Sequence, residues 1–146
     1  MARILIVGYG NPLKSDDSLG WRAAEEIVRQ LPSPELKVMR VHQLVPEIAE
    51  EASRAELAIF IDTRSGEPAG HIVCDQLTNE TGAGSTFSHQ LSPSTIVQLA
   101  RELYGRSPRA YLLTVSGECF EDGETLSPAV QAALPKLITR VKILIS

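Results

Sequence analysis

The stretch ARILIVGYGNPLKSDDSLG, residues 2–20, joins an apolar run to a polar loop and to the start of an amphipathic segment. Residues 2–8 are mostly apolar and end in a glycine, which is typical of a buried strand. From Ser18 to Leu31 apolar residues recur every three or four positions, and Pro32 then ends the pattern. The stretch therefore predicts a strand, a loop and a helix in succession.

The rest of the chain repeats this alternation of apolar runs and amphipathic stretches. The expected strands cover residues 36–41, 57–61, 70–77 and 110–115, and the expected helices begin near Val45, Ser92 and Ser127. Such alternation is typical of an α/β fold, a three-layer sandwich in which a twisted, mostly parallel sheet of about five strands carries helices on both faces. We expect residues 1–146 to form one domain of this kind.

The expected order of the strands indicates where function should lie. Right-handed crossovers place the first strand between the second and the third. The loops that leave the first and third strands then lie side by side at the carboxyl edge of the sheet, where folds of this class bind ligands. We therefore expect function to depend on residues 8–17 and 62–66.

Composition excludes several classes of function. The net charge of −4 and the pI of about 5.4 offer no basic surface to a nucleic acid. The apolar runs are far shorter than the ~20 residues that cross a bilayer, and no signal-peptide pattern follows Met1. Cys74 and Cys119 form no CxxC pair, so we expect free thiols in a reducing compartment. The expected protein is a cytoplasmic monomer.

A Gly-x-Gly directly after a strand, here Gly8 and Gly10, first suggests a dinucleotide-binding loop. The third glycine of that motif would fall at position 13, which is Leu13, and no acidic residue suited to a ribose follows the second strand. Asp16 and Asp17 would also repel a pyrophosphate from the start of the helix. The pattern therefore argues against nucleotide binding.

Two acidic segments and one histidine suggest a metal site. One aspartate of the pair Asp16 and Asp17 is expected at the N-cap or in the first turn of the helix, where it satisfies free N–H groups and favours the helix dipole. The second aspartate adds like-charge repulsion and needs another explanation. Asp62 closes the third strand and either caps a turn or joins Asp17. His89 ends a polar, glycine-bearing loop, whereas His71 is expected at the opposite end of the sheet. Two carboxylates and one imidazole suit a divalent ion such as nickel or zinc, although each residue also has an ordinary structural explanation.

The same residues resemble the opening signature of the hydrogenase maturation endopeptidases, a strand followed by G-x-G-N-x-L-x-x-D-(D/E)-x-x-G. The matching positions are Gly8, Gly10, Asn11, Leu13, Asp16, Asp17 and Gly20. Asp62, followed by Gly66, resembles the second motif of the family. The third motif is similar to Ser88-His89 followed by Leu91, and the segment GETLSP at 123–128 is similar to the start of the closing helix.

The resemblance implies an activity, a partner and a site. The activity is one cut that removes the C-terminal extension of the large subunit of a nickel–iron hydrogenase, and the partner is the nickel-loaded precursor. The metal-binding trio of the family carries over to Asp17, Asp62 and His89, with nickel expected as the ion of the substrate rather than a permanent cofactor. Asp17 or His89 would carry the proton during catalysis. Asn11 and Asp16 would shape the substrate loop or support the ligands.

Two alternatives remain open. Cys119 or Cys74 could pair with His89 in a Cys–His hydrolase, although Cys74 lies within an expected strand and is most simply a core residue. A non-catalytic accessory protein that binds nickel or a partner would share the fold without cutting. The presence of all three ligand types favours the enzyme.

Overall fold

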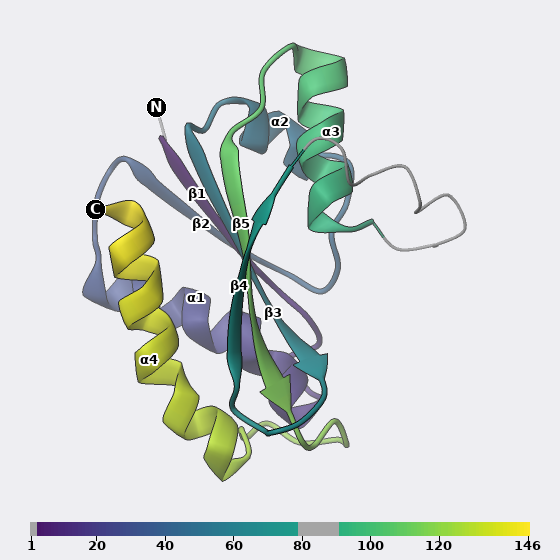
Figure 1. The fold of residues 1–146 in the computed structure, drawn as a ribbon, viewed down its shortest axis with the longest axis vertical. Helices are drawn as coiled ribbons and strands as arrows, with labels where there is room; N and C mark the ends of the chain where they lie inside the picture. The colour runs from purple at the N-terminus through teal and green to yellow at the C-terminus, as the bar shows by residue number, and fades with distance from the viewer. Residues whose placement is uncertain (1–2, 79–90) are drawn as a thin grey trace.

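The structure is a computed structural model that describes residues 3–78 and 91–146. In these ranges the strands form one sheet in the order β2-β1-β3-β5-β4 (Figure 1). The strands are β1 (Ile4–Tyr9), β2 (Leu36–Val41), β3 (Leu57–Ser65), β4 (Ile72–Leu77) and β5 (Arg109–Gly117). Neighbours are parallel except β4, which pairs antiparallel with β5 at the border of the sheet. The predicted α/β class and the position of the first strand between the second and third are confirmed.

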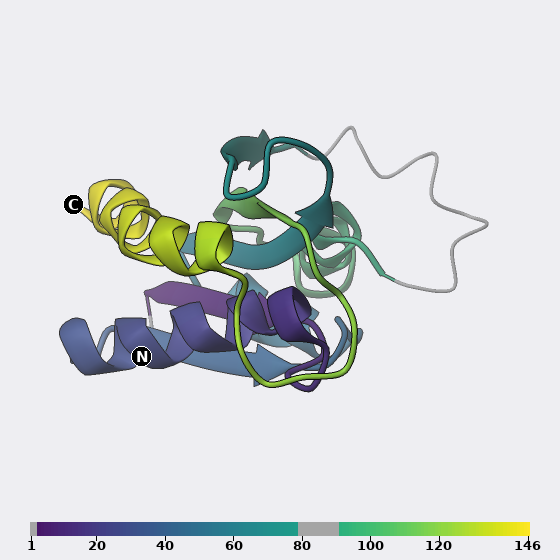
Figure 2. The ribbon, with the colours of Figure 1, turned by 90° about the horizontal axis from the view of Figure 1, so that it is seen from below.

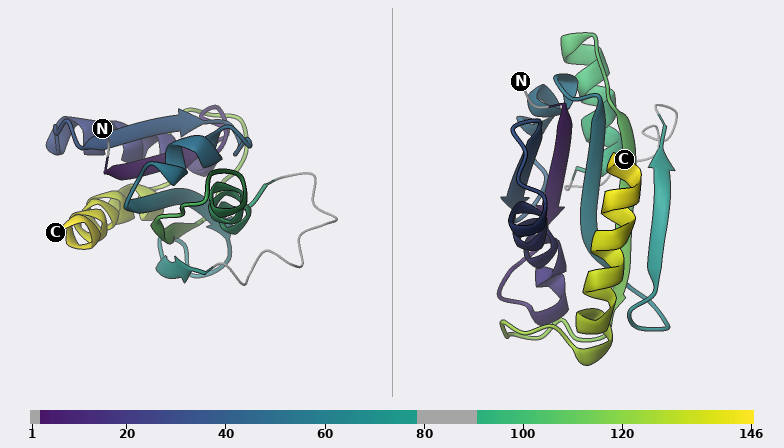
Figure 3. Two further views of the ribbon diagram at one scale, coloured as in Figure 1. Left: turned by 90° about the horizontal axis from the view of Figure 1, so that it is seen from above. Right: turned by 90° about the vertical axis from the view of Figure 1, so that its left-hand side faces the viewer.

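Helices cover both faces of the sheet and give the three predicted layers (Figures 2 and 3). They are α1 (Leu19–Gln30), α2 (Ile48–Ser53), α3 (Pro93–Tyr104) and α4 (Pro128–Ile145), with a 3-10 turn, η1 (Ser15–Ser18), directly before α1. One face carries α1 and α4, and the other carries α2 and α3. Across the described ranges, every helix is too short or too polar to span a bilayer.

The alternation of side chains along β3 divides the core into two clusters. Ile59 and Ile61 pack with α1 and α4, whereas Ala58 and Phe60 pack with α2 and α3. All four side chains are fully buried. Because successive residues of a strand point to opposite faces, Asp62 continues the row of Ala58 and Phe60 toward the carboxyl edge.

The third strand is longer than the sequence pattern predicts. Its pairing with β1 ends where Gly8 lies opposite Ile61, which is the expected strand end. Its pairing with β5 continues until Ser65 lies opposite Gly117. Asp62 therefore lies inside β3 rather than in the loop after it, and the partner strand rather than apolar patterning sets the end of β3.

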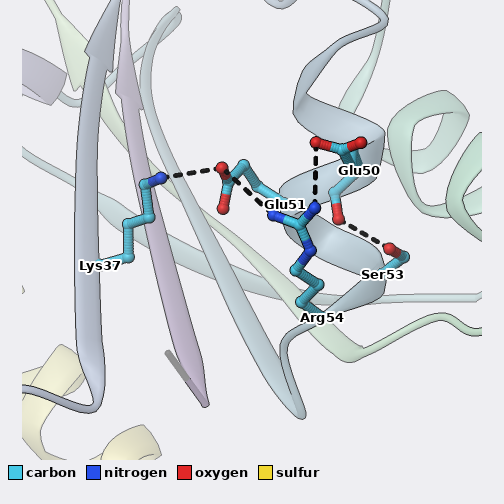
Figure 4. A network of polar contacts seen from close by, with 5 residues as sticks. All are labelled: Lys37, Glu50, Glu51, Ser53 and Arg54. Atoms are coloured by element: carbon cyan, nitrogen blue, oxygen red, sulfur yellow. Dashed lines mark hydrogen bonds and ion pairs between the residues drawn. The ribbon is translucent and has the colours of Figure 1, made fainter. Parts of the chain in front are cut away.

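Polar contacts join α2 to the neighbouring strand β2 (Figure 4). Lys37 of β2 donates to the Glu51 carboxylate of α2 at 2.8 Å. Arg54 pairs with Glu50 at 3.2 Å and with Glu51 at 3.9 Å, and the Ser53 hydroxyl donates to the Glu50 carbonyl at 2.6 Å. Since these charged groups are in contact with water, they orient α2 more than they stabilise the fold.

Candidate functional site

The carboxyl edge of the sheet brings Tyr9 and Asp62 together. Tyr9 ends β1 and Asp62 follows the last residue of β3 that pairs with β1, so the two side chains leave the same face of neighbouring strands. The Tyr9 hydroxyl donates a hydrogen bond to the Asp62 carboxylate. Burial raises the pKa of Tyr9 well above its ordinary value, and the charge of Asp62 raises it further. The phenol therefore keeps its proton and remains a donor.

Asp62 is a carboxylate whose ionisation is opposed by its surroundings. Burial is the largest influence and raises the pKa of Asp62 to about 7, and the nearby charge of Asp17 acts in the same direction. Hydrogen bonds from the Thr63 backbone N–H and the Tyr9 hydroxyl oppose this rise without cancelling it. Near neutral pH, Asp62 therefore exchanges a proton readily. A cation that offsets the charge of Asp17 would stabilise the ionised form of Asp62.

The turn η1 carries Asp17 to the same edge. One carboxylate oxygen of Asp17 accepts the backbone N–H of Asn11 at 2.8 Å, while the Asn11 side-chain oxygen accepts the N–H of Leu13 at 2.9 Å. Gly10 has a φ of +137°, and a Cβ built on it would lie 2.3 Å from the Asp17 carbonyl oxygen. The loop therefore packs against Asp17 closely enough to exclude any side chain at position 10.

Asp16, the neighbour of Asp17, is fully buried and makes a different set of contacts. Its carboxylate accepts the backbone N–H groups of Glu118 at 2.9 Å, Cys119 at 3.0 Å and Ser127 at 2.7 Å, and also the Ser127 hydroxyl at 2.8 Å. Burial alone would raise the pKa of Asp16, but these hydrogen bonds outweigh it and hold the pKa below its ordinary value. Asp16 thus fastens η1 to the segment 118–127.

Asp16 and Asp17 both lie in the first turn of η1, which is one of the two places predicted for an aspartate of this pair. The residues that precede η1 and α1 as N-caps, Lys14 and Ser18, make no side-chain capping hydrogen bond in the described structure. The carboxylate oxygens of Asp16 and Asp17 instead accept hydrogen bonds from backbone N–H groups outside the helix. Two adjacent carboxylates with separate partners explain why the pair is tolerated despite like charge.

The described histidines lie on the two flanks of this edge. His71 precedes β4, and its carbonyl accepts the backbone N–H of Ser116 at the end of β5 at 2.9 Å. Since β4 runs antiparallel, the prediction that His71 lies at the opposite end of the sheet is wrong. His42 follows β2 and meets the Trp21 ring edge-on, with 5.8 Å between ring centroids. Within residues 3–78 and 91–146 no three potential ligands cluster, and His89 lies outside the described residues.

The two cysteines differ in position. Cys119 follows β5 at the carboxyl edge, and both its backbone N–H and its carbonyl bind Asp16. Cys74 lies in β4 and packs against the core cluster of α1 and α4. Burial raises the pKa of the Cys74 thiol, which disfavours the thiolate that a nucleophile needs. Cys74 is therefore a core residue, as the strand position predicts.

Tyr9 was not predicted as a site residue, although the sequence contains a signal for it. Leu5 and Val7 of β1 are fully buried toward α2 and α3, and a period of two places Tyr9 next in that row. The signal is the strand periodicity, which continues one residue past the predicted strand end at Gly8.

The donor set fits a divalent cation. Two carboxylates lie close enough for the charge of Asp17 to raise the pKa of Asp62, and a cation between them would remove that repulsion. Carboxylate oxygens are ligands for first-row divalent ions, and an added imidazole would favour nickel or zinc. The carboxyl edge can therefore hold a metal ion with Asp17 and Asp62 as two of its ligands.

Comparison with known proteins gives a result for the fold. No family model matches the chain, and no curated protein matches it significantly. The NiFe hydrogenase maturation protease HybD from Thermococcus kodakarensis is 19% identical, with a TM-score of 0.77 and coverage of 99% of each chain. The protease HycI from the same organism is 20% identical, with a TM-score of 0.77 over 99% of this chain and 94% of that one. The hydrogenase maturating endopeptidase HybD from E. coli is 21% identical, with a TM-score of 0.74 over 95% and 89%. The chain thus has the fold of the hydrogenase maturation endopeptidases.

Proposed function

We propose that this protein is an endopeptidase that removes the C-terminal extension of a nickel–iron hydrogenase large subunit after nickel has been inserted. The observation that carries the proposal is the coupling of Asp17 and Asp62 at the carboxyl edge, within a fold shared with hydrogenase maturation proteases. Both aspartates also match the motifs by which the sequence resembles that family.

In this proposal Asp17, Asp62 and His89 contact the nickel that the precursor already holds. Leu91, two residues after His89, packs on the same apolar cluster as Tyr9, whose hydroxyl binds Asp62. His89 itself lies outside the described residues, so its place beside the two carboxylates is part of the proposal. Nickel is therefore part of the substrate, and a precursor without it offers these ligands nothing to bind.

The residues of the chain have separate roles in the cut. The nickel ion supplies polarisation of the scissile carbonyl or of a water molecule, which lowers the barrier by several kcal/mol in metal-assisted hydrolysis. Asp17 or His89 carries the proton to the leaving nitrogen. The Asn11 N–H orients the Asp17 carboxylate, and Asp16 fixes the turn that presents it.

Exposed apolar side chains around this edge support a protein as the substrate. Leu13 follows β1, Val45 follows β2 and Phe120 follows β5, and their exposed fractions are 60%, 38% and 39%. All three loops leave the carboxyl edge of the sheet, where we propose that the precursor docks. We place the reaction in the cytoplasm and expect the enzyme to act as a monomer.

The proposal is tested by incubating the purified protein with nickel-loaded large-subunit precursors and measuring the mass of the products. Loss of a short C-terminal peptide is expected with the wild type and not with Asp17→Asn or Asp62→Asn. The exposed Asp75 of β4 provides the control Asp75→Asn, which should cleave normally. Normal cleavage by either site variant would show that the site is assigned wrongly. If no precursor is cut but nickel binding depends on Asp17 and Asp62, the accessory protein is the better description.

A further inference from the structure

Thr63 of β3 connects the two backbone segments that carry Asp62 and Asp17. It directly follows Asp62, and its hydroxyl donates a hydrogen bond to the carbonyl oxygen of Asp16 at 2.6 Å. That carbonyl belongs to the peptide bond between Asp16 and Asp17. One hydrogen bond therefore links the residue next to Asp62 with the peptide group that precedes Asp17, between positions 47 residues apart in the chain.

The position of Thr63 in the sheet explains how its hydroxyl reaches the turn η1. Ile59 and Ile61 point to the face that carries α1 and α4, and a period of two places Thr63 next in that row. Thr63 is 8% exposed, and a hydroxyl buried at the end of an apolar row needs an acceptor. The Asp16 carbonyl is that acceptor, and it also accepts the backbone N–H of Leu19, where α1 begins. Thr63 therefore holds the turn at the point where it becomes a helix.

Gly117, the last residue of β5, allows the turn and the strand to approach each other. A Cβ built on Gly117 would lie 2.8 Å from the Thr63 Cγ2 atom and 3.0 Å from the Asp16 Cβ atom. The same Cβ would lie 2.7 Å from the ring of Phe120. The side chains of Thr63 and Asp16 therefore both pack against this glycine. The hydrogen bond between them lies within close packing, which is what a rigid support for a binding site requires.

We propose that Thr63 is a positioning residue whose hydroxyl sets the separation of the Asp17 and Asp62 carboxylates for a divalent ion. The inference rests on the proposed function, because it takes these two aspartates as ligands of nickel. Thr63 acts through the backbone: its hydroxyl holds the peptide group before Asp17, and its own N–H donates to the Asp62 carboxylate. Residues that support ligands in this way typically contribute about tenfold or more to metal affinity.

The two carboxylates need a support of this kind because their charges repel each other. The charge of Asp17 disfavours ionisation of Asp62, so the folded protein holds the pair together at a cost in free energy. An ion binds more tightly when both ligands are already in place, since it does not have to order them. The hydrogen bond from Thr63 provides a fixed point between the two segments before the ion arrives.

The test measures binding of nickel to the purified protein by isothermal titration calorimetry, with nickel chloride as the probe. The wild type should bind the ion, and Asp17→Asn and Asp62→Asn should each lose this binding. Thr63→Val keeps the shape of the side chain without the hydroxyl, so the affinity for nickel should fall about tenfold. Thr63→Ser keeps the hydroxyl and should bind nickel as the wild type does.

Ser53→Ala is the matched control. Ser53 is 7% exposed, and its hydroxyl also donates to a backbone carbonyl at 2.6 Å, but it ends α2, which leads into the amino end of β3. Thr63→Val and Ser53→Ala should lower the urea midpoint by similar amounts, because each loses one buried hydrogen bond. Only Thr63→Val should weaken nickel binding. A lower midpoint together with wild-type nickel affinity in Thr63→Val would assign Thr63 to the fold alone and overturn the inference.

Cleavage of a nickel-loaded precursor separates this result from the fate of the proposed function. Thr63→Val should cut with a kcat/KM about tenfold lower, and Thr63→Ser should restore it. If the wild type binds no free nickel, this comparison alone decides. An unchanged kcat/KM in Thr63→Val, with cleavage still lost in Asp17→Asn and Asp62→Asn, would overturn the inference and leave the endopeptidase in place.

Nickel binding that depends on Thr63 and both aspartates, without cleavage of any precursor, would support the positioning role and defeat the endopeptidase. Neither nickel binding nor cleavage by the wild type would defeat both.

Discussion

Gly8 of β1 and Gly20 of α1 meet backbone to backbone. A Cβ built on Gly8 would lie 2.0 Å from the Gly20 carbonyl oxygen, and one built on Gly20 would lie 2.7 Å from the Ile61 carbonyl oxygen and from the Tyr9 nitrogen. The start of α1 therefore rests directly on β1 and β3 beside Asp62. The two glycines of the opening signature set how near η1, with Asp17, lies to the sheet.

Substitution of either glycine should destabilise the protein. Gly8→Ala and Gly20→Ala place a methyl group against backbone atoms that cannot rotate away, so we expect a loss of about 3 kcal/mol or more in the free energy of unfolding. Urea denaturation measures it. Gly105→Ala is the matched control, because Gly105 has a φ of +74° but nothing within 4 Å of a built Cβ. Gly105→Ala should lower the free energy of unfolding by only ~1 kcal/mol, from the strain of a left-handed backbone conformation. An equal loss in all three variants would contradict the close contact of Gly8 with Gly20.

The pKa of Asp62 predicts how the stability of the metal-free protein depends on pH. The folded protein holds this proton until about pH 7, whereas an unfolded aspartate releases it near pH 4. Protonated Asp62 therefore stabilises the folded state by on the order of 4 kcal/mol below pH 4. This stabilisation is lost as the pH rises toward 7.

Asp62→Asn should remove this dependence. Urea denaturation in a chelator, at several pH values from 4 to 8, should show a variant that becomes more stable than the wild type toward pH 8. Parallel curves for the two proteins would mean that Asp62 ionises normally.

Asp16 is expected to matter for folding. Asp16→Ala leaves three buried backbone N–H groups without their acceptor, so we expect a loss of about 3–5 kcal/mol in the free energy of unfolding at neutral pH. The loss should shrink in acid, because the lowered pKa of Asp16 gives stability that is present above about pH 4 and lost below it. Asp122→Ala, which removes an exposed ion pair with Lys14, is the control and should hardly move the urea midpoint.

The loops at the carboxyl edge should determine affinity for the precursor. Leu13→Asp should raise the KM for the nickel-loaded precursor about tenfold, because it removes an apolar contact worth more than 1 kcal/mol. Leu103 on α3 is 62% exposed, close to the 60% of Leu13, and Leu103→Asp is the control. Equal KM values for the two variants would place the docking surface elsewhere.

Much of the fold could be predicted because the patterns that decide it are local. Continuous apolar runs marked β1 and β3, and serine–proline pairs marked the starts of α3 and α4. The handedness of crossovers then placed Asp17 and Asp62 at one edge, where the charge of Asp17 acts to raise the pKa of Asp62.

Other features depend on contacts between distant segments. The direction of β4 cannot be read from its own residues. Residues 66–71 are too few for a parallel crossover and so require an antiparallel strand, a signal that the prediction for His71 did not use. The partners of Asp16 lie more than a hundred positions away, at Glu118, Cys119 and Ser127, so local patterns could suggest only a helix cap.

The most direct measurement of the central claim compares one precursor with and without nickel. Equal amounts of nickel-loaded and nickel-free large-subunit precursor are incubated with the wild-type protein, and the released C-terminal peptide is followed by mass spectrometry. Cleavage of the nickel-loaded form alone is the predicted result. Equal cleavage of the two forms would contradict the role of Asp17, Asp62 and His89 as ligands of the substrate's ion.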